Sequence, residues 1–301
     1  MSRSGALLPV SALVLNAFVW GVSWWPLRQL QENGLHPLWA TTLVYVLVFF
    51  SLLALNFNAW RGFIAYPQLC FLAVAAGLTN VGFNWAVTVG DVVRVVLLFY
   101  LMPAWSVLVA WLMLGEKPTR GSLLRLLLAM TGVLVVLKSP HSPWPVPQGL
   151  TDWLAIMGGL SFAVTNALLR KFSHAPSSTR MLAMFGGGSL MAAASALLGM
   201  QQQLVAAPAL QAAGVPVALA LALGFMAGNA ALQYGAAKLA ASTTAIVMLT
   251  EILFASVSAV ALGAAEFSPR IMLGGSLIVL AALMAAMAPG ADVMQNRSDP
   301  A

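Results

Sequence analysis

Two stretches decide the fold: YLMPAWSVLVAWLMLGEKPT, from Tyr100 to Thr119, and TEILFASVSAVALGAAEFSP, from Thr250 to Pro269. Each is an apolar run that closes in a small residue and a glutamate, Glu116 in the first and Glu266 in the second. The two glutamates lie 150 residues apart in a chain of 301. A fixed offset of half the chain predicts two related halves. Two further pairs share this offset, Asn16 with Asn166 and Arg120 with Arg270.

The composition indicates an integral membrane protein. The chain is 61% hydrophobic and only 7% charged, whereas a soluble domain carries about 25% charged residues. A bilayer-spanning helix needs about 20 apolar residues, and we expect roughly ten such spans. The predicted windows are Leu7–Pro26, His36–Phe57, Tyr66–Val89, Val93–Gly115, Arg120–Lys138, Leu150–Arg170, Arg180–Gly199, Pro216–Ala236, Ala240–Ala264 and Pro269–Ala288.

A proline-rich break, SPHSPWPVPQG, separates five windows from the next five. Proline cannot continue a helix, so the break marks the junction between the halves. We therefore predict a first five-helix repeat over 1–138, a connecting loop over 139–149 and a second five-helix repeat over 150–288. The polar end, 289–301, is expected to be a disordered cytoplasmic tail.

The loop charges predict the orientation. With a cytoplasmic N-terminus, four cations fall outside, Arg28, Arg94, Lys138 and Arg270, which leaves ten of the 14 Lys and Arg residues inside. The positive-inside rule then places both termini in the cytoplasm. Five spans per half is an odd number, so the two repeats are inverted. Inverted repeats are typical of secondary transporters, whose substrate site lies near the midplane.

Short motifs resemble the drug/metabolite transporter superfamily in its ten-helix, EamA-like branch. They are Trp20-Gly21-x-Ser23, the run from Tyr100 through Pro103 to Glu116, and the run from Thr250 to Glu266. Within the superfamily the chain looks most like the YddG-type aromatic amino acid exporters. The resemblance implies a central cavity lined by the first, third and fourth helices of each half. The second run departs from the first, because Leu253 stands where a proline would match Pro103.

Amides in the predicted spans indicate which faces point inward. Asn80 and Asn84 lie four residues apart and so on one helix face, as do Asn229 and Gln233. Unpartnered amides are costly in hydrocarbon, so these faces should meet the cavity or another helix. The candidate cavity residues are Asn16, Trp20, Asn80, Asn84, Trp85, Tyr100, Trp105, Asn166, Asn229, Gln233, Tyr234 and Glu251, with Pro103 as a helix break or gate.

Glu251 is the one ionisable side chain near the middle of a predicted span. A carboxylate there costs about 2.5–3.5 kcal/mol on insertion scales, so it indicates a functional site. It could bind a substrate ammonium, exchange a proton or hold helix ends together. The tryptophans and Tyr100 offer flat surfaces on which an aromatic substrate could stack.

These observations favour a secondary transporter of the bacterial cytoplasmic membrane. It would export aromatic and other hydrophobic amino acids by alternating access, as a monomer or weak homodimer. A multidrug or hydrophobic-cation exporter is the first alternative, and an intramembrane enzyme is the alternative from another class. We expect no enzyme activity, metal or cofactor, since the sequence has no His-Glu-x-x-His, cysteine pair or P-loop. The net charge of +6 forms no patch that would suit nucleic acid. The sequence leaves proton coupling open.

Overall fold

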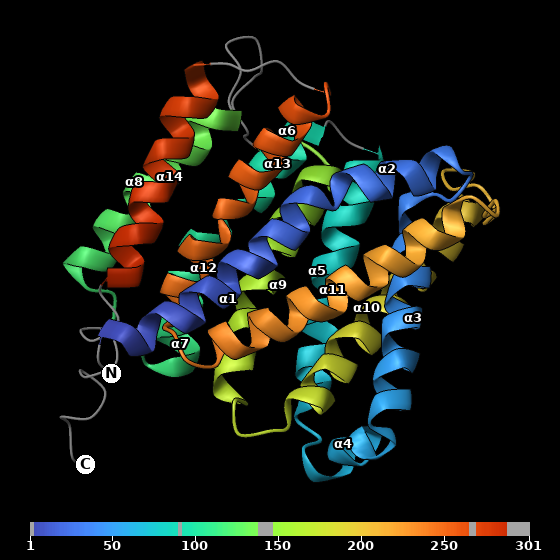
Figure 1. The fold of residues 1–301 in the computed structure, drawn as a ribbon, viewed down its shortest axis with the longest axis horizontal. Coiled ribbons are helices and arrows are strands. Elements are labelled where there is room, and N and C mark those ends of the chain that lie inside the picture. Colours follow the sequence, from blue (N-terminus) through green and yellow to red (C-terminus); the bar gives the residue numbers. More distant parts are fainter. Residues whose placement is uncertain (1–2, 90–91, 138–146, 265–268, 288–301) are drawn as a thin grey trace.

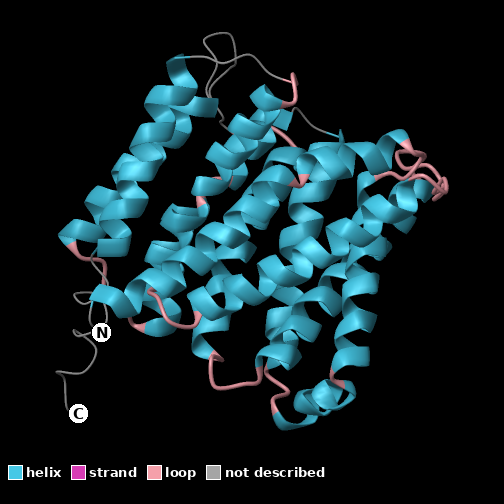
Figure 2. Cartoon of the chain, in the orientation of Figure 1, coloured by secondary structure: helices cyan, strands magenta, loops and turns pink. Residues whose placement is uncertain are grey.

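The computed structural model describes residues 3–89, 92–137, 147–264 and 269–287. Every regular element in these ranges is a helix (Figure 2). Within them, ten helical segments are long and apolar enough to cross a membrane. The predicted all-α membrane fold with ten spans is confirmed. Glu266, most of the proline-rich loop and the tail from 289 lie outside the described residues.

The first five spans occupy the chain up to residue 137. Two of them, the first and the fourth, each consist of two helices, and two short helices lie between the second and third spans. The elements are α1 (Arg3–Val22), α2 (Trp24–Glu32), α3 (Pro37–Leu55), η1 (Phe57–Arg61), α4 (Gly62–Ala65), α5 (Leu69–Val89), α6 (Val92–Phe99), α7 (Met102–Leu114) and α8 (Arg120–Leu137).

The last five spans repeat this order in simpler form. The elements are α9 (Leu150–Lys171), α10 (Ser177–Gln201), α11 (Gly214–Ala236), α12 (Ala241–Met248), α13 (Thr250–Ala261) and α14 (Pro269–Met287).

Helices of one half pack mainly against helices of the other half. The third span of each half packs along the first span of the other, α5 on α9 and α11 on α1. Likewise, α1 packs against α12 and α13, and α9 packs against α6 and α7. Figure 1 shows α8 and α14 paired at one edge, while α3 and α10 pack together on the opposite side. This scheme is the one expected for two five-helix repeats; the repeat boundaries stay a prediction.

The fourth span of each half is interrupted near its middle. The first interruption lies at Tyr100 and Leu101 and the second at Leu249, and we call these the two mid-span junctions. At both, the backbone uses hydrogen bonds three residues back, from Leu101 N to Leu98 O at 3.3 Å and from Leu249 N to Ile246 O at 3.2 Å. A tighter turn of this kind can interrupt a helix without proline. The absence of a second proline therefore does not make the halves differ.

The first span is longer than its predicted window, which ended at Pro26. The structure continues it through α2 to Glu32, with Ser23 between the two helices. Pro26 is tolerated because it lies in the first turn of α2, where its missing N–H has no helical acceptor. The hydroxyl of Ser23 donates to the carbonyl of Trp20 at 2.7 Å, which holds the bend.

Glycines allow the helices of the two halves to approach closely. A Cβ atom on Gly187 in α10 would lie 2.1 Å from the carbonyl oxygen of Ala73 in α5. Gly82 of α5 faces Gly158 of α9 in a similar way, with a Cβ 2.8 Å from its Cα. Without a hydrophobic driving force between helices in lipid, such close backbone packing supplies much of the association energy.

We expect Gly187→Ala to destabilise the protein and Gly224→Ala to leave its stability unchanged or raised. The first methyl group would meet backbone, and overpacking of that kind costs about 1–3 kcal/mol. The second would lie 3.7 Å from Val19 in ordinary contact, and alanine is about 1 kcal/mol better than glycine inside a helix. Thermal unfolding in detergent compares the two variants, and equal melting temperatures would contradict the packing argument.

Candidate functional site

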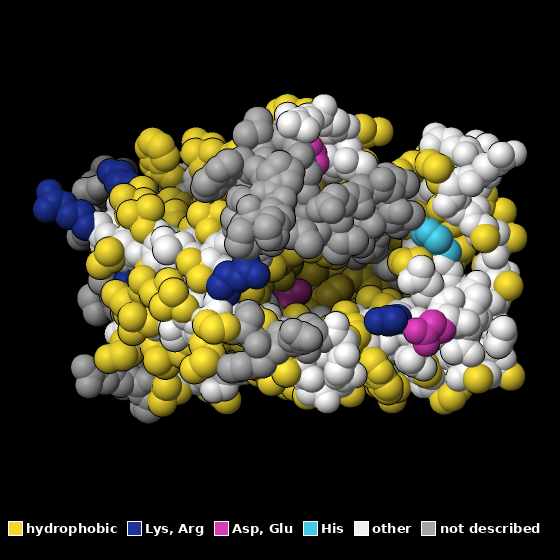
Figure 3. All heavy atoms as spheres, turned by 90° about the horizontal axis from the view of Figure 1, so that it is seen from above, with side chains coloured by type: hydrophobic (Ala, Val, Ile, Leu, Met, Phe, Trp, Pro, Cys, Tyr) yellow, Lys and Arg dark blue, Asp and Glu magenta, His cyan; other side chains and the backbone are white. Residues whose placement is uncertain are grey.

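A cavity of about 550 Å³ lies between the two halves. Figure 3 looks onto the upper face of Figure 1 and shows it hollowed near the middle, with hydrophobic side chains and an acidic side chain inside the hollow. This is the face on which α2 lies and at which α13 ends. The volume is within the range of about 300–1,000 Å³ typical of small-molecule sites.

The cavity gathers part of the predicted set and leaves part of it elsewhere. Six predicted residues line it, Trp20, Asn80, Asn84, Tyr100, Asn229 and Glu251. The other seven are not among its lining residues in the described chain: Asn16, Trp85, Pro103, Trp105, Asn166, Gln233 and Tyr234.

Sequence reasoning missed much of the apolar lining. Phe83 lies three residues after Asn80, so the helical spacing of the amides could have revealed it. Phe162 carried the same signal, because it lies three residues before Thr165 and four before Asn166. Phe99 carried none, since no polar residue lies three or four positions from it. The second span of each half also contributes, through Thr41 and Tyr45 of α3 and Met184 and Phe185 of α10. The second spans therefore line the cavity together with the first, third and fourth helices that the resemblance implies.

Stacked rings form one wall of the cavity. The indole of Trp20 stacks on Phe225 with ring centroids 4.4 Å apart and an interplanar angle of 23°. Tyr45 meets the edge of the same phenylalanine, with centroids 6.1 Å apart. Such a wall presents flat apolar surface to a ligand and is itself held in one geometry.

Two of the cavity amides are held by hydroxyl groups of α3. The hydroxyl of Tyr45 donates to Oδ1 of Asn80 at 3.0 Å, and Nδ2 of Asn80 donates to the carbonyl of Ala76 at 2.8 Å. Nδ2 of Asn84 donates to Oγ1 of Thr41 at 2.9 Å. These bonds tie α5 to α3 at the cavity wall.

The third cavity amide, Asn229 of α11, has different partners. Its Oδ1 accepts a hydrogen bond from Nε2 of Gln233 at 3.1 Å. Its Nδ2 faces the thioether sulfur of Met184 at 3.6 Å, and thioethers are weak acceptors. Gln233 is fully buried, so it supports Asn229 from behind the cavity wall.

Glu251 is the one charged side chain among the described cavity residues. It lies in the first turn of α13, where the helix N-terminus favours a carboxylate. The phenol of Tyr100 forms a hydrogen bond with its carboxyl group. Because Tyr100 belongs to one mid-span junction and Glu251 adjoins the other, this bond joins the two interrupted spans at the centre of the molecule.

Gly21 allows the first span to reach this centre. A Cβ atom there would lie 2.6 Å from the backbone carbonyl oxygen of Glu251 and 2.7 Å from Cβ of Phe254. The glycine of the Trp20-Gly21-x-Ser23 motif therefore has a packing reason to be small.

Asn16 and Asn166, paired by the 150-residue offset, are both buried outside the cavity. Nδ2 of Asn16 donates to the sulfur of Met248 at 3.2 Å, next to the second mid-span junction. Its Oδ1 and both polar atoms of Asn166 have no hydrogen-bond partner among the described residues. Both amides lie in helix interfaces in this conformation.

Glu116 joins three spans at the end of the molecule opposite the cavity mouth. It forms an ion pair with Arg170 at the end of α9, and its other oxygen accepts from Ala241 N at 3.3 Å, at the start of α12. The guanidinium of Arg170 also donates to the carbonyl of Leu239. The closing glutamate of the first motif thus connects the fourth, sixth and ninth spans. We call Glu116, Arg170 and the 239–241 backbone the end clasp.

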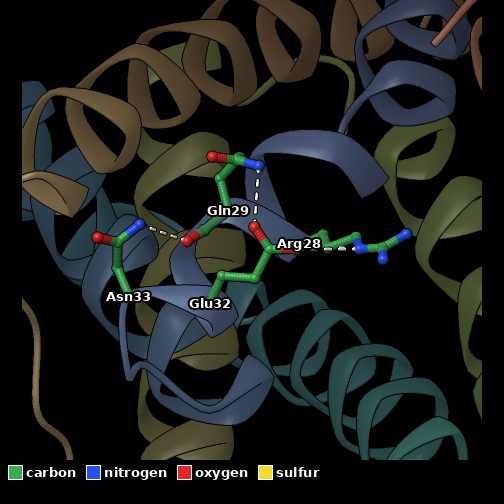
Figure 4. Close-up of polar contacts among 4 residues, drawn as sticks. All are labelled: Arg28, Gln29, Glu32 and Asn33. Carbon is green, nitrogen blue, oxygen red and sulfur yellow. Dashed lines mark hydrogen bonds and ion pairs between the residues drawn. The ribbon is translucent and has the colours of Figure 1, made fainter.

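Removing the charge of Glu116 should destabilise the protein much more than removing a surface charge. Glu116→Gln leaves the largely buried Arg170 without its counter-ion, which costs about 3 kcal/mol. The matched control is Glu32→Gln, which breaks the exposed Arg28–Glu32 pair of α2 (Figure 4). Exposed pairs four residues apart contribute about 0.3–0.5 kcal/mol.

Detergent unfolding of both variants measures the difference. A swap of the end-clasp charges, Glu116→Arg with Arg170→Glu, should fail to restore stability, because both side chains also bond to backbone groups. Full recovery in the swapped protein would show that only the charge pairing matters.

No group of three or more His, Cys, Asp or Glu side chains within the described ranges could hold a metal ion.

Comparison with known proteins identifies the first half. Residues 7–138 match the EamA-like transporter family. A protein of solved crystal structure has the same fold, with a TM-score of 0.71 and 18% sequence identity over 96% of this chain and 100% of its own. No curated protein matches the chain. Residues 7–138 are thus similar to an EamA-like transporter domain, the solved structure shares the fold, and nothing in these comparisons supports the YddG-type subgroup.

Proposed function

We propose that this chain, whose residues 7–138 match the EamA-like transporter family, is a secondary transporter that exports aromatic and other hydrophobic amino acids by alternating access. One observation carries the proposal. A cavity between the two halves, lined by aromatic rings and one carboxylate, opens at one end of the molecule, and the end clasp joins three spans at the other.

The positive-inside prediction assigns the two ends. The end clasp lies among cations that the prediction places in the cytoplasm, including Lys117, Lys171 and Lys238. The cavity mouth then faces outward from a bacterial cytoplasmic membrane. This conformation would be the outward-open state of the transport cycle.

The two mid-span junctions suit a rocking motion. Each divides a span into two short helices whose hydrogen bonds are already tightened, so small changes of dihedral angle there can tilt one half-span. For the opposite end to open, α7 would have to separate from α9 and α12. That movement breaks the end clasp and brings the buried amide of Asn166 towards water, where its polar atoms gain partners.

The lining favours a ligand with a flat apolar part and a polar end. Trp20 and Phe225 already stack at 4.4 Å, and a third ring can extend such a stack. The ammonium group of an amino acid suits the carboxylate of Glu251.

A hydrophobic-cation exporter is the second candidate. The observation that favours it is that Glu251 has no cationic neighbour among the described cavity residues. An isolated carboxylate beside aromatic faces would bind a lipophilic cation through ion pairing and cation–π contacts.

Counterflow in proteoliposomes tests both candidates. Vesicles preloaded with unlabelled phenylalanine should take up labelled phenylalanine without an ion gradient, and tryptophan should compete while a quaternary ammonium dye should not. If phenylalanine did not exchange and a labelled quaternary ammonium dye did, cation export would replace amino acid export.

Glu251→Gln tests the carboxylate in the same assay. We expect at least a tenfold loss of phenylalanine counterflow, because a hydrogen bond or ion pair to a charged group contributes about 1.5–3 kcal/mol. Glu32→Gln, which removes a carboxylate from the exposed Arg28 pair, is the control and should keep full activity. Unaltered counterflow in the Glu251→Gln protein would assign Glu251 a structural role.

A further inference from the structure

The three amides that line the cavity differ in which of their atoms are already engaged. Asn80 uses its nitrogen and its oxygen in bonds to oxygen atoms of the protein. Asn84 gives its nitrogen to Thr41 at 2.9 Å. Asn229 is the one whose nitrogen meets, among the described residues, only a sulfur atom, that of Met184 at 3.6 Å. It is therefore the amide whose N–H donors are best placed to serve a ligand.

Gln233 determines which way the amide of Asn229 points. Nε2 of Gln233 donates to Oδ1 of Asn229 at 3.1 Å, and the hydroxyl of Ser177 lies 3.5 Å from Oε1 of Gln233 as its donor. Turning Asn229 over would place two NH₂ groups against each other. Gln233 is fully buried and cannot exchange its partner for water. The chain Ser177–Gln233–Asn229 therefore leaves the nitrogen of Asn229 for the cavity.

We propose that Asn229 donates to the carboxylate of the transported amino acid and that Gln233 is the positioning residue that presents this donor. The inference rests on the proposed function and deepens it. An anionic group needs donors in an apolar cavity, and hydrogen bonds to a charged group are the strong ones. Asn229 would thus make the transporter discriminate between an amino acid and an amine that carries the same ring but no carboxylate.

Phenylalanine and phenethylamine make the matched pair of probes. They share the aromatic ring and the ammonium group, and only phenylalanine carries a carboxylate. Counterflow of each labelled compound in proteoliposomes gives its KM and maximal rate for the wild-type protein and for each variant.

Asn229→Asp replaces the donor by an anion of the same shape. We expect the KM for phenylalanine to rise at least tenfold while its maximal rate changes little, and the KM for phenethylamine to fall. Asn80→Asp is the matched control, since it places the same charge in the same cavity on an amide that already has partners. Its effect on phenylalanine should be several times smaller.

Gln233→Glu tests the positioning step at a residue that does not itself line the cavity. A carboxylate at 233 accepts from the nitrogen of Asn229, which turns the oxygen of Asn229 towards the cavity. The KM for phenylalanine should then rise as in Asn229→Asp, while a merely structural residue would lower the maximal rate for both compounds. Size-exclusion profiles and melting temperatures show that each variant is folded.

Three results would overturn the inference alone. They are equal effects of Asn229→Asp on both compounds, equal effects of Asn229→Asp and Asn80→Asp on phenylalanine, or a wild type that carries phenethylamine better than phenylalanine. A folded wild type that carries neither compound would overturn the proposed function, and this inference with it.

Discussion

A bilayer offers no hydrogen-bond partners, and the rest of the structure depends on that constraint. Every described span is helical, so the backbone satisfies its own donors and acceptors. Where the fourth and ninth spans are interrupted, the backbone tightens to bonds three residues back instead of losing them. Side-chain amides obey the same rule. Asn80 and Asn84 are held by hydroxyl groups of α3, and Asn229 is held by Gln233.

The same constraint explains where Glu251 and Glu116 lie. Glu251 lies in the first turn of α13, at the second mid-span junction, so the N-terminus of α13 and the phenol of Tyr100 both stabilise its carboxylate. Glu116 lies at a span end, where Arg170 and the start of α12 meet it. One carboxylate thus joins the interrupted spans at the centre, and the other joins three spans at the closed end. A transport cycle would have to keep the first connection or exchange it for substrate, and release the second.

Particular residues show how far sequence reasoning could go. The run of ten apolar windows predicted the spans because the length needed to cross a bilayer depends on composition alone. Asn80 and Asn84 both line the cavity, and their four-residue spacing had placed them on one inward helix face. Both polar atoms of Asn80 are nevertheless hydrogen-bonded to the protein. Gln233 shares a helix face with Asn229 and yet is fully buried. A four-residue spacing predicts the face on which a side chain lies but not whether it reaches the cavity surface. Trp105 packs near Ala163 and Ala167 in a helix interface, where its prediction as a cavity residue has no structural counterpart in this conformation.

The sequence by itself predicted a membrane protein with ten spans arranged as two related halves. Hydropathy, span length and a fixed offset suffice for this, because they depend only on the order of residues along the chain. Only the tertiary structure decided which side chains share the cavity. Tyr100 and Glu251 lie 151 residues apart, and Trp20 and Phe225 lie 205 apart, so no local pattern could join them. Their meeting depends on helices of one half packing along helices of the other, which glycines such as Gly21 and Gly187 permit by letting backbones touch.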